Sequence, residues 1–163
     1  MDRKGTFEQL MRECGPLIRR IAASYEADKE LARDLAQEIF LAVWRALPSF
    51  RAESSLRTFV ARIAHNRAVT HVARSASVPE SVEFPDELPC PAPELEAVAI
   101  EHDRRARTLA AVQKLPLAYR QVATLILEGF TPPEVAQTLG LTVNAVSIRA
   151  TRARAMLRSL LGE

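Results

Sequence analysis

Residues 131 to 144 read TPPEVAQTLGLTVN and contain the clearest structural signals of the chain. Thr131 is suited to cap a helix, Glu134 follows three residues later as in a capping box, and proline is tolerated in a first helical turn. Gly140 ends the short apolar face, and Thr142 is a second capping residue before a longer helix. This spacing predicts a helix-turn-helix, in which a short helix and a tight turn lead into a second helix.

The second helix of this pair is predicted to run from Val143 toward Leu161, and it is rich in arginine. An α-helix fits the major groove of DNA, where its first residues face base edges while cationic side chains contact phosphates. The side chains predicted to contact DNA are Thr142, Asn144, Ser147, Ile148, Arg149, Arg152 and Arg154. A basic surface helix in an ordinary helical bundle is the alternative that the pattern alone leaves open.

Outside this motif, apolar residues recur at intervals of three and four, and no sustained alternating run indicates a strand. The fold class is therefore predicted as all-α. A first helix is expected after Thr6, with a break or kink at Gly15-Pro16. A second helix is expected from near Asp28, with Leu31 in its buried stripe, to Pro48. The remaining helices are expected over residues 55–74, 93–115 and 116–127.

Charge and proline content divide the chain into two small helical domains and a connector. Residues 1–74 carry a net charge of +4, residues 75–100 carry −6 and residues 101–163 carry +4. Prolines between Ser75 and Pro93 stand among acidic residues without a helical period, which predicts a flexible, extended linker. The predicted organisation is a domain over 1–74, an acidic linker over 75–93 and a helix-turn-helix domain over 94–163. Basic modules of this kind suit a polyanion such as DNA.

Composition also argues against several classes of protein. No apolar run is long enough to span a membrane and no signal core follows the N-terminus, so we expect a cytoplasmic protein without membrane insertion of its own. Cys14 and Cys90 stand far apart, which argues against a disulfide framework, and the histidines have no metal-ligand spacing. Without a glycine-rich phosphate loop or a nucleophile–base pair, neither an enzyme nor a cofactor or metal site is expected.

Several short motifs resemble the extracytoplasmic-function (ECF) sigma factors of bacterial RNA polymerase. Residues 34–40, which read DLAQEIF, together with Trp44, Phe50-Arg51 and the RIAHN of residues 62–66, resemble region 2 of that family. The LPLAYR of residues 115–120, the EVA of residues 134–136 and residues 146–154 resemble its region 4. The resemblance spans nearly the whole chain in family order. It implies a protein that binds core RNA polymerase and promoter DNA, regulated by an anti-sigma factor.

The resemblance also implies roles for particular residues. The polymerase-binding ridge corresponds to Asp34, Gln37 and Glu38, and the helix-turn-helix would bind the −35 element. The residues implied to hold the melted −10 element are Phe50, Arg51, Arg62, Asn66 and Arg67. Phe50 and Phe59 equally suit a packing role, because aromatic residues at helix spacing are usually in the core. The acidic linker would thread toward the polymerase active centre, or would act only as a solvated tether.

Some positions depart from the family pattern. Thr70 stands where region 2 commonly has aspartate, and Ser147 and Ile148 replace a lysine and a serine common in region 4. These departures motivate an alternative, a sigma mimic that binds an anti-sigma factor without contacting promoter DNA. A helix-turn-helix regulator with a helical sensor domain is a third possibility, against which stands the match over residues 34–66.

Overall fold

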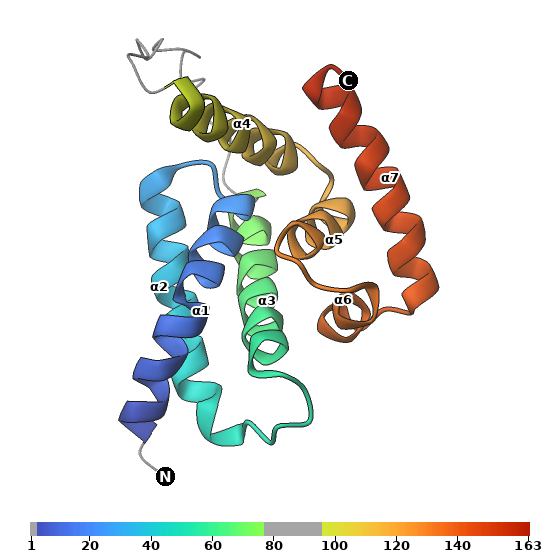
Figure 1. Cartoon of the computed structure of the whole chain (residues 1–163). Helices are drawn as coiled ribbons and strands as arrows, with labels where there is room; N and C mark the ends of the chain where they lie inside the picture. The colour runs from blue at the N-terminus through green and yellow to red at the C-terminus, as the bar shows by residue number, and fades with distance from the viewer. Residues whose placement is uncertain (1–2, 77–95) are drawn as a thin grey trace.

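The computed structural model describes residues 3–76 and 96–163, so Cys90 and nearly all of the predicted linker lie outside the described residues. Every regular element within those two ranges is a helix, which confirms the all-α prediction (Figure 1). The elements are α1 (Arg3–Tyr25), α2 (Lys29–Ala46), the short 3-10 helix η1 (Leu47–Ser49), α3 (Leu56–Ala76), α4 (Glu96–Gln113), α5 (Leu117–Leu127), α6 (Pro132–Leu139) and α7 (Val143–Leu161). Among them, no helix combines the length and hydropathy that crossing a bilayer requires.

Helices α1, α2 and α3 pack around a shared apolar core. Ile18 and Ile21 of α1 and Ile39 of α2 are fully buried. Helix α3 presents a row of small side chains, including Ala61 and Ala64, which are also fully buried. Small side chains let helix backbones approach closely, so this row of alanines suits the packing of α3 against α1 and α2.

Helix α1 differs from its prediction at both Thr6 and Pro16. It begins at Arg3 rather than after Thr6, and it continues through Pro16 to Tyr25 as one helix, so the expectation of a break is wrong. Proline removes one backbone hydrogen bond. Leu17 and Ile18, directly after Pro16, are buried, and we attribute the continuity of the helix to this packing, which offsets the lost bond.

The helix-turn-helix forms as predicted, and its local signals are all visible. Thr131 Oγ1 accepts a hydrogen bond from the Glu134 N–H at 3.4 Å, and Glu134 Oε2 accepts one from the Thr131 N–H at 2.7 Å. Gly140 closes α6 with a φ of 68°, a left-handed conformation that glycine adopts without strain. Thr142 Oγ1 then accepts from the Ala145 N–H at 3.1 Å and starts α7. Side-chain caps thus fix both helix starts.

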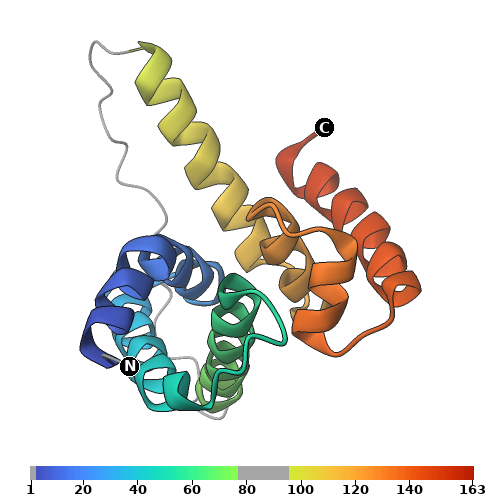
Figure 2. The ribbon, with the colours of Figure 1, turned by 60° about the horizontal axis from the view of Figure 1, so that its bottom comes forward.

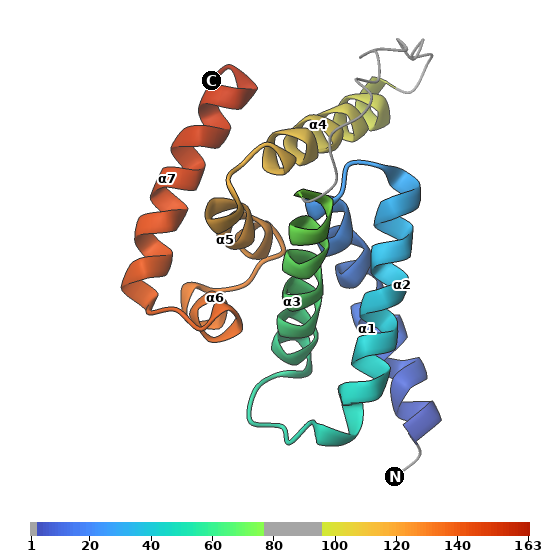
Figure 3. The same cartoon turned by 180° about the vertical axis from the view of Figure 1, so that it is seen from behind.

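The two halves of the chain are in contact. Helix α3 lies between α1 and α2 on one side and α5 and α6 on the other, as the front and back views agree (Figures 1 and 3). Leu125, Phe130 and Val135 join the same buried cluster as the residues of the first half. The first part of α4 projects away from the body, as the turned view shows (Figure 2). The first half therefore shares one apolar cluster with α5, α6 and the start of α7, while Leu115, Ala123 and Ala153 form a second, smaller cluster within the second half.

Candidate nucleic-acid interface and docking ridge

Helix α7 has a buried face and an opposite polar face. Val146, Ala150 and Ala153 are buried and hold the helix against its neighbours. At about 100° per residue, three of the predicted base-facing residues, Asn144, Ser147 and Ile148, fall away from this face, and all three are exposed. The fourth, Thr142, is exposed at the cap that precedes the helix. The first turns of α7 therefore offer an amide, a hydroxyl and an apolar group to a partner.

The predicted phosphate-contacting arginines are not equivalent. Arg152 and Arg154 are exposed, whereas Arg149 is half-buried in a shallow pocket of about 340 Å³ beside Tyr119. Arg149 lies roughly 140° around the helix from Asn144, on its flank. In a helix inserted into a groove, the flank faces the DNA backbone, and this position suits a phosphate contact better than a base contact.

On α2, the predicted docking residues form one exposed ridge. Asp34, Gln37 and Glu38 are all exposed, and Leu35, Ile39 and Phe40 are buried behind them. Asp28 caps the helix, because its carboxylate accepts hydrogen bonds from the Glu30 and Leu31 N–H groups at 2.9 and 3.0 Å. The ridge thus stands on a helix that is fixed at its start and along its inner face.

Two leucines of α2 give the ridge an apolar component that the sequence did not reveal. Leu31, expected in the buried stripe, is 46% exposed, and Leu41 is 48% exposed. Leu31 precedes the buried Leu35 by four residues, which turns it about 40° away from the buried face of the helix. A shallow pocket of about 340 Å³ beside the ridge is lined by Phe7, Met11, Arg19, Gln37, Phe40, Leu41 and Trp44. Exposed leucines beside polar groups are typical of protein-binding surfaces.

Trp44 is held in place by two residues of α1. Phe7 packs edge-on against it with ring centroids 4.9 Å apart. The Arg3 guanidinium lies 4.1 Å from the Trp44 ring centroid and donates to the Trp44 carbonyl at 2.7 Å. These contacts fix the end of α2 next to the ridge.

The loop before α3 and the exposed face of α3 carry the residues predicted to hold melted DNA. Arg51, Arg62, Asn66 and Arg67 are exposed. Phe50 is half-buried and packs on Phe59, with ring centroids 4.9 Å apart. The two aromatic rings thus support the loop in this conformation.

The interior of α3 contains a buried polar pair behind Asn66. Tyr25 Oη lies 2.6 Å from His65 Nδ1, and His65 Nε2 has no hydrogen-bond partner among the described residues. Burial away from water lowers the pKa of His65 to about 4 and raises that of Tyr25. His65 is therefore a neutral core residue. Nowhere in the described ranges do three or more potential metal ligands gather.

One predicted DNA-contacting side chain is engaged within the chain. Arg62 Nη2 donates to the Gln137 carbonyl oxygen at 2.8 Å, linking α3 to α6. Nearby, the Arg57 guanidinium lies 4.4 Å from the Phe130 ring centroid and donates to the Glu128 carbonyl. Sequence patterns gave no sign of these contacts, because they join residues more than seventy positions apart.

Comparison with known proteins places both halves in one class. Residues 10–78 match the family model of sigma-70 region 2, and residues 105–157 match that of sigma-70 region 4. RNA polymerase sigma factor NccH of Alcaligenes xylosoxydans xylosoxydans is 30% identical over 95% of this chain and 86% of its own length. ECF RNA polymerase sigma factor SigM of Mycobacterium tuberculosis is 29% identical over 96% of this chain and 77% of its own.

Solved structures agree. CnrH, in a complex with the cytosolic domain of CnrY, superposes with a TM-score of 0.70 at 28% identity, covering 98% of this chain and 89% of that one. The fold is also that of RpoE in its complex with the anti-sigma factor NepR from Bartonella quintana, with a TM-score of 0.74. The helix-turn-helix, the region order and these likenesses define a sigma-70-type transcription factor. The chain belongs to the ECF RNA polymerase sigma factors. It is thus a promoter-specificity subunit that binds core RNA polymerase and directs transcription initiation.

Proposed function

We propose that this sigma factor uses three surfaces: the α2 ridge for core polymerase, the α3 face for the −10 element and the α7 recognition helix for the −35 element. Asp34, Gln37 and Glu38 dock on a basic surface of core RNA polymerase, with Leu31 and Leu41 adding apolar contact. The residues that hold the melted −10 element are Phe50, Arg51, Arg62, Asn66 and Arg67. Those that bind the −35 element are Thr142, Asn144, Ser147, Ile148, Arg149, Arg152 and Arg154.

The observation that carries this proposal is the arrangement of α7. Its apolar residues face inward, its start is capped by Thr142, and its first turns expose Asn144 and Ser147 beside exposed Arg152. A capped helix with free polar groups at its start and cations along its length suits insertion in a major groove.

Ile148 supports a particular kind of −35 contact. Ile148 is 46% exposed, in the middle of the side of α7 that this proposal assigns to DNA. An apolar side chain in the major groove contacts a thymine methyl group favourably. We therefore expect this sigma factor to prefer a thymine at one position of its −35 element.

Run-off transcription with purified core polymerase tests the assignment. Asn144→Ala and Arg152→Ala should reduce initiation at a promoter whose −35 element is intact, and they should have little effect where initiation does not depend on that element. Ser159→Ala, at an exposed position in the last turn of α7 and far from the helix start, is the matched control. Equal losses for the control and the test variants would count against the assigned contacts.

We further propose that an anti-sigma factor restrains the free protein. Its relative CnrH has been solved with the cytosolic domain of CnrY bound. The exposed leucines flanking the α2 ridge offer a second protein the surface that polymerase would use. Addition of the cognate inhibitor should therefore reduce core binding competitively, and a non-competitive effect would contradict shared use of this surface.

The second candidate is a sigma mimic that titrates an anti-sigma factor. The motivation is that Thr70, Ser147 and Ile148 depart from the residues that the family commonly has at these positions. Promoter-dependent run-off product would exclude the mimic. In either case the chain acts by binding rather than as an enzyme, and in the cytoplasm, where the polymerase is.

A further inference from the structure

A pocket of about 450 Å³ between α1 and α2 is lined by three cationic side chains and by no acidic one. Arg19 comes from α1, and Lys29 and Arg33 come from the first turns of α2, which lies beside α1 in the front and back views (Figures 1 and 3). All three residues are exposed, and within residues 3–76 and 96–163 none of them forms an ion pair. The pocket therefore gathers positive charge that could attract an anion.

The acidic residues of α2 lie on a neighbouring side of the helix. Lys29 and Arg33 are four residues apart and share one side, whereas Glu30 and Asp34 each follow by one residue, about 100° further around. Lys29 and Arg33 line the pocket, and the two acids do not. The basic row of α2 thus borders the pocket, while the acidic row continues toward the docking ridge.

The rest of the lining is mostly small. Ala23 of α1 and Ala32 and Ala36 of α2 line the pocket. The Arg19 guanidinium lies 5.5 Å from the ring centroid of Phe40, which is itself only 7% exposed. A ligand would bury little apolar area on these groups, so its affinity has to come from charge. This favours a compact ligand of high charge over an acidic peptide.

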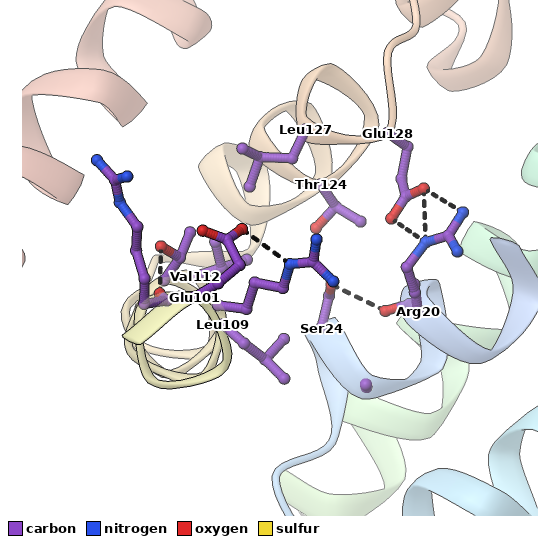
Figure 4. Close-up of a pocket in the computed structure, with 12 residues that line it drawn as sticks. Arg20, Ser24, Glu101, Leu109, Val112, Thr124, Leu127 and Glu128 are labelled. Atoms are coloured by element: carbon purple, nitrogen blue, oxygen red, sulfur yellow. Dashed lines mark hydrogen bonds and ion pairs between the residues drawn. The ribbon is translucent and has the colours of Figure 1, made fainter. Parts of the chain in front are cut away.

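Arginines in the other pocket of about 450 Å³, between α1, α4 and α5, already have acidic partners (Figure 4). Arg20 Nη2 lies 2.8 Å from Glu128 Oε2, and Arg105 Nε donates to Glu101 Oε1 at 3.1 Å. An anion entering that pocket would have to displace a carboxylate. In the α1–α2 pocket, an anion would meet cations without such a competitor.

Phosphate is the anion that suits these side chains best. A guanidinium group binds phosphate oxygens in pairs, and a lysine ammonium group adds a point charge. The three cations of the lining carry +3, and two phosphate groups together carry about −3 at neutral pH. A volume of about 450 Å³ also falls in the range of small-molecule sites, roughly 300 to 1,000 Å³.

We propose that the α1–α2 pocket binds a small molecule that bears a diphosphate group. The pocket shares Gln37 with the docking ridge, so the bound ligand would cover a side chain that the proposed function assigns to core polymerase. The ligand and the polymerase would then compete for this side chain. This second part of the inference rests on the proposed function, whereas the site itself does not.

Isothermal titration calorimetry of the full chain with inorganic pyrophosphate tests the site. Arg19→Gln and Arg33→Gln each remove one charge and keep a polar side chain, and each should weaken pyrophosphate binding about three- to tenfold. Arg45→Gln, at an exposed position of α2 outside the pocket, is the matched control and should bind as the wild type does. No binding by the wild type at about 1 mM pyrophosphate, or equal losses for all three variants, would overturn the site.

Other anions distinguish a diphosphate site from its alternatives. Sulfate and inorganic phosphate should bind at least about tenfold more weakly than pyrophosphate, and equal affinities would mean an adventitious ion only. A DNA duplex of arbitrary sequence supplies phosphates from nucleic acid. If Arg33→Gln weakened duplex binding as much as pyrophosphate binding, the pocket would be a contact for the DNA backbone, and the small-molecule site would be overturned.

Competition with core polymerase tests the second part of the inference. Saturating pyrophosphate should weaken core binding by the wild-type chain, and it should not affect the double variant Arg19→Gln with Arg33→Gln. Pyrophosphate that binds the chain but leaves core affinity unchanged would overturn the shared use of Gln37 and leave the site established. Failure of the wild-type chain to bind core polymerase without pyrophosphate would overturn the proposed function instead.

Discussion

The buried His65 makes a quantitative prediction about stability in acid. Its pKa is about 4 in the folded chain, because burial disfavours the imidazolium, against 6.5 in an exposed chain. The unfolded state therefore binds more protons than the native state between these values, and stability falls as the pH drops from about 6.5 to about 4. At about 1.4 kcal/mol per pKa unit, this one side chain removes roughly 3 kcal/mol of folding free energy over that window.

The local geometry explains why protonation is unfavourable. His65 is 2% exposed, and when neutral it can accept the Tyr25 hydroxyl proton at Nδ1. The imidazolium has no lone pair to accept with, and its charge would lie in a core with no acidic partner in contact among the described residues. Rotation of the Tyr25 hydroxyl would let its oxygen accept from the imidazolium Nδ1–H, but it would not compensate the buried charge, which is the source of the penalty.

Urea unfolding followed by circular dichroism at pH values from 7 to 4 measures this effect. The slope of free energy against pH for the wild type should exceed that of His65→Gln, whose side chain can still accept from Tyr25 but does not titrate. His71→Gln, at a half-buried histidine of the same helix, is the control for a general histidine effect. Parallel curves for the wild type and His65→Gln would refute the reasoning.

Three further results are expected. Arg152→Ala should weaken duplex binding and reduce the slope of log affinity against log salt by about 0.9, measured by anisotropy, whereas an unchanged slope would mean that Arg152 contacts no phosphate. Glu38→Arg should weaken core polymerase binding about tenfold or more, and Glu30→Arg, at the start of the same helix, should weaken it less. Equal losses would mean that binding depends on the overall charge of α2 and not on the residues of the ridge. Thr142→Ala should cost about 1 kcal/mol of stability and Thr142→Ser much less, and equal denaturation midpoints would contradict the capping role.

Local features of the fold were predictable from the sequence. The caps at Thr131, Thr142 and Asp28 depend on side-chain contacts within three residues, which sequence spacing encodes directly. The turn at Gly140 depends on a left-handed φ that glycine adopts without strain, which the residue type encodes. The polar α2 ridge and the exposed start of α7 could be predicted from the helical period. Where apolar residues form a regular buried stripe, the residues on the opposite side of the helix are exposed.

Features that depend on tertiary packing were not predictable. Helix α1 continues through Pro16 where its neighbours bury the following residues, and Leu31 is 46% exposed although it has the same four-residue spacing as the buried Leu35 and Ile39. Arg149 belongs to the same arginine-rich stretch as the exposed Arg152 and Arg154. It is nevertheless half-buried, in a pocket that Tyr119 of α5 also lines. Arg62 of α3 contacts the carbonyl of Gln137 in α6, and the sequence motif of neither region indicates a contact with the other.

We conclude that this chain determines which start sites RNA polymerase uses. This can be tested by sequencing the 5′ ends of transcripts made in vitro from fragmented genomic DNA of the source cell, by core enzyme with and without the chain. We predict a discrete set of new 5′ ends that appears only with the chain and shares a common sequence near −10 and −35. The same 5′ ends in both reactions, from a chain shown to be folded, would contradict the claim.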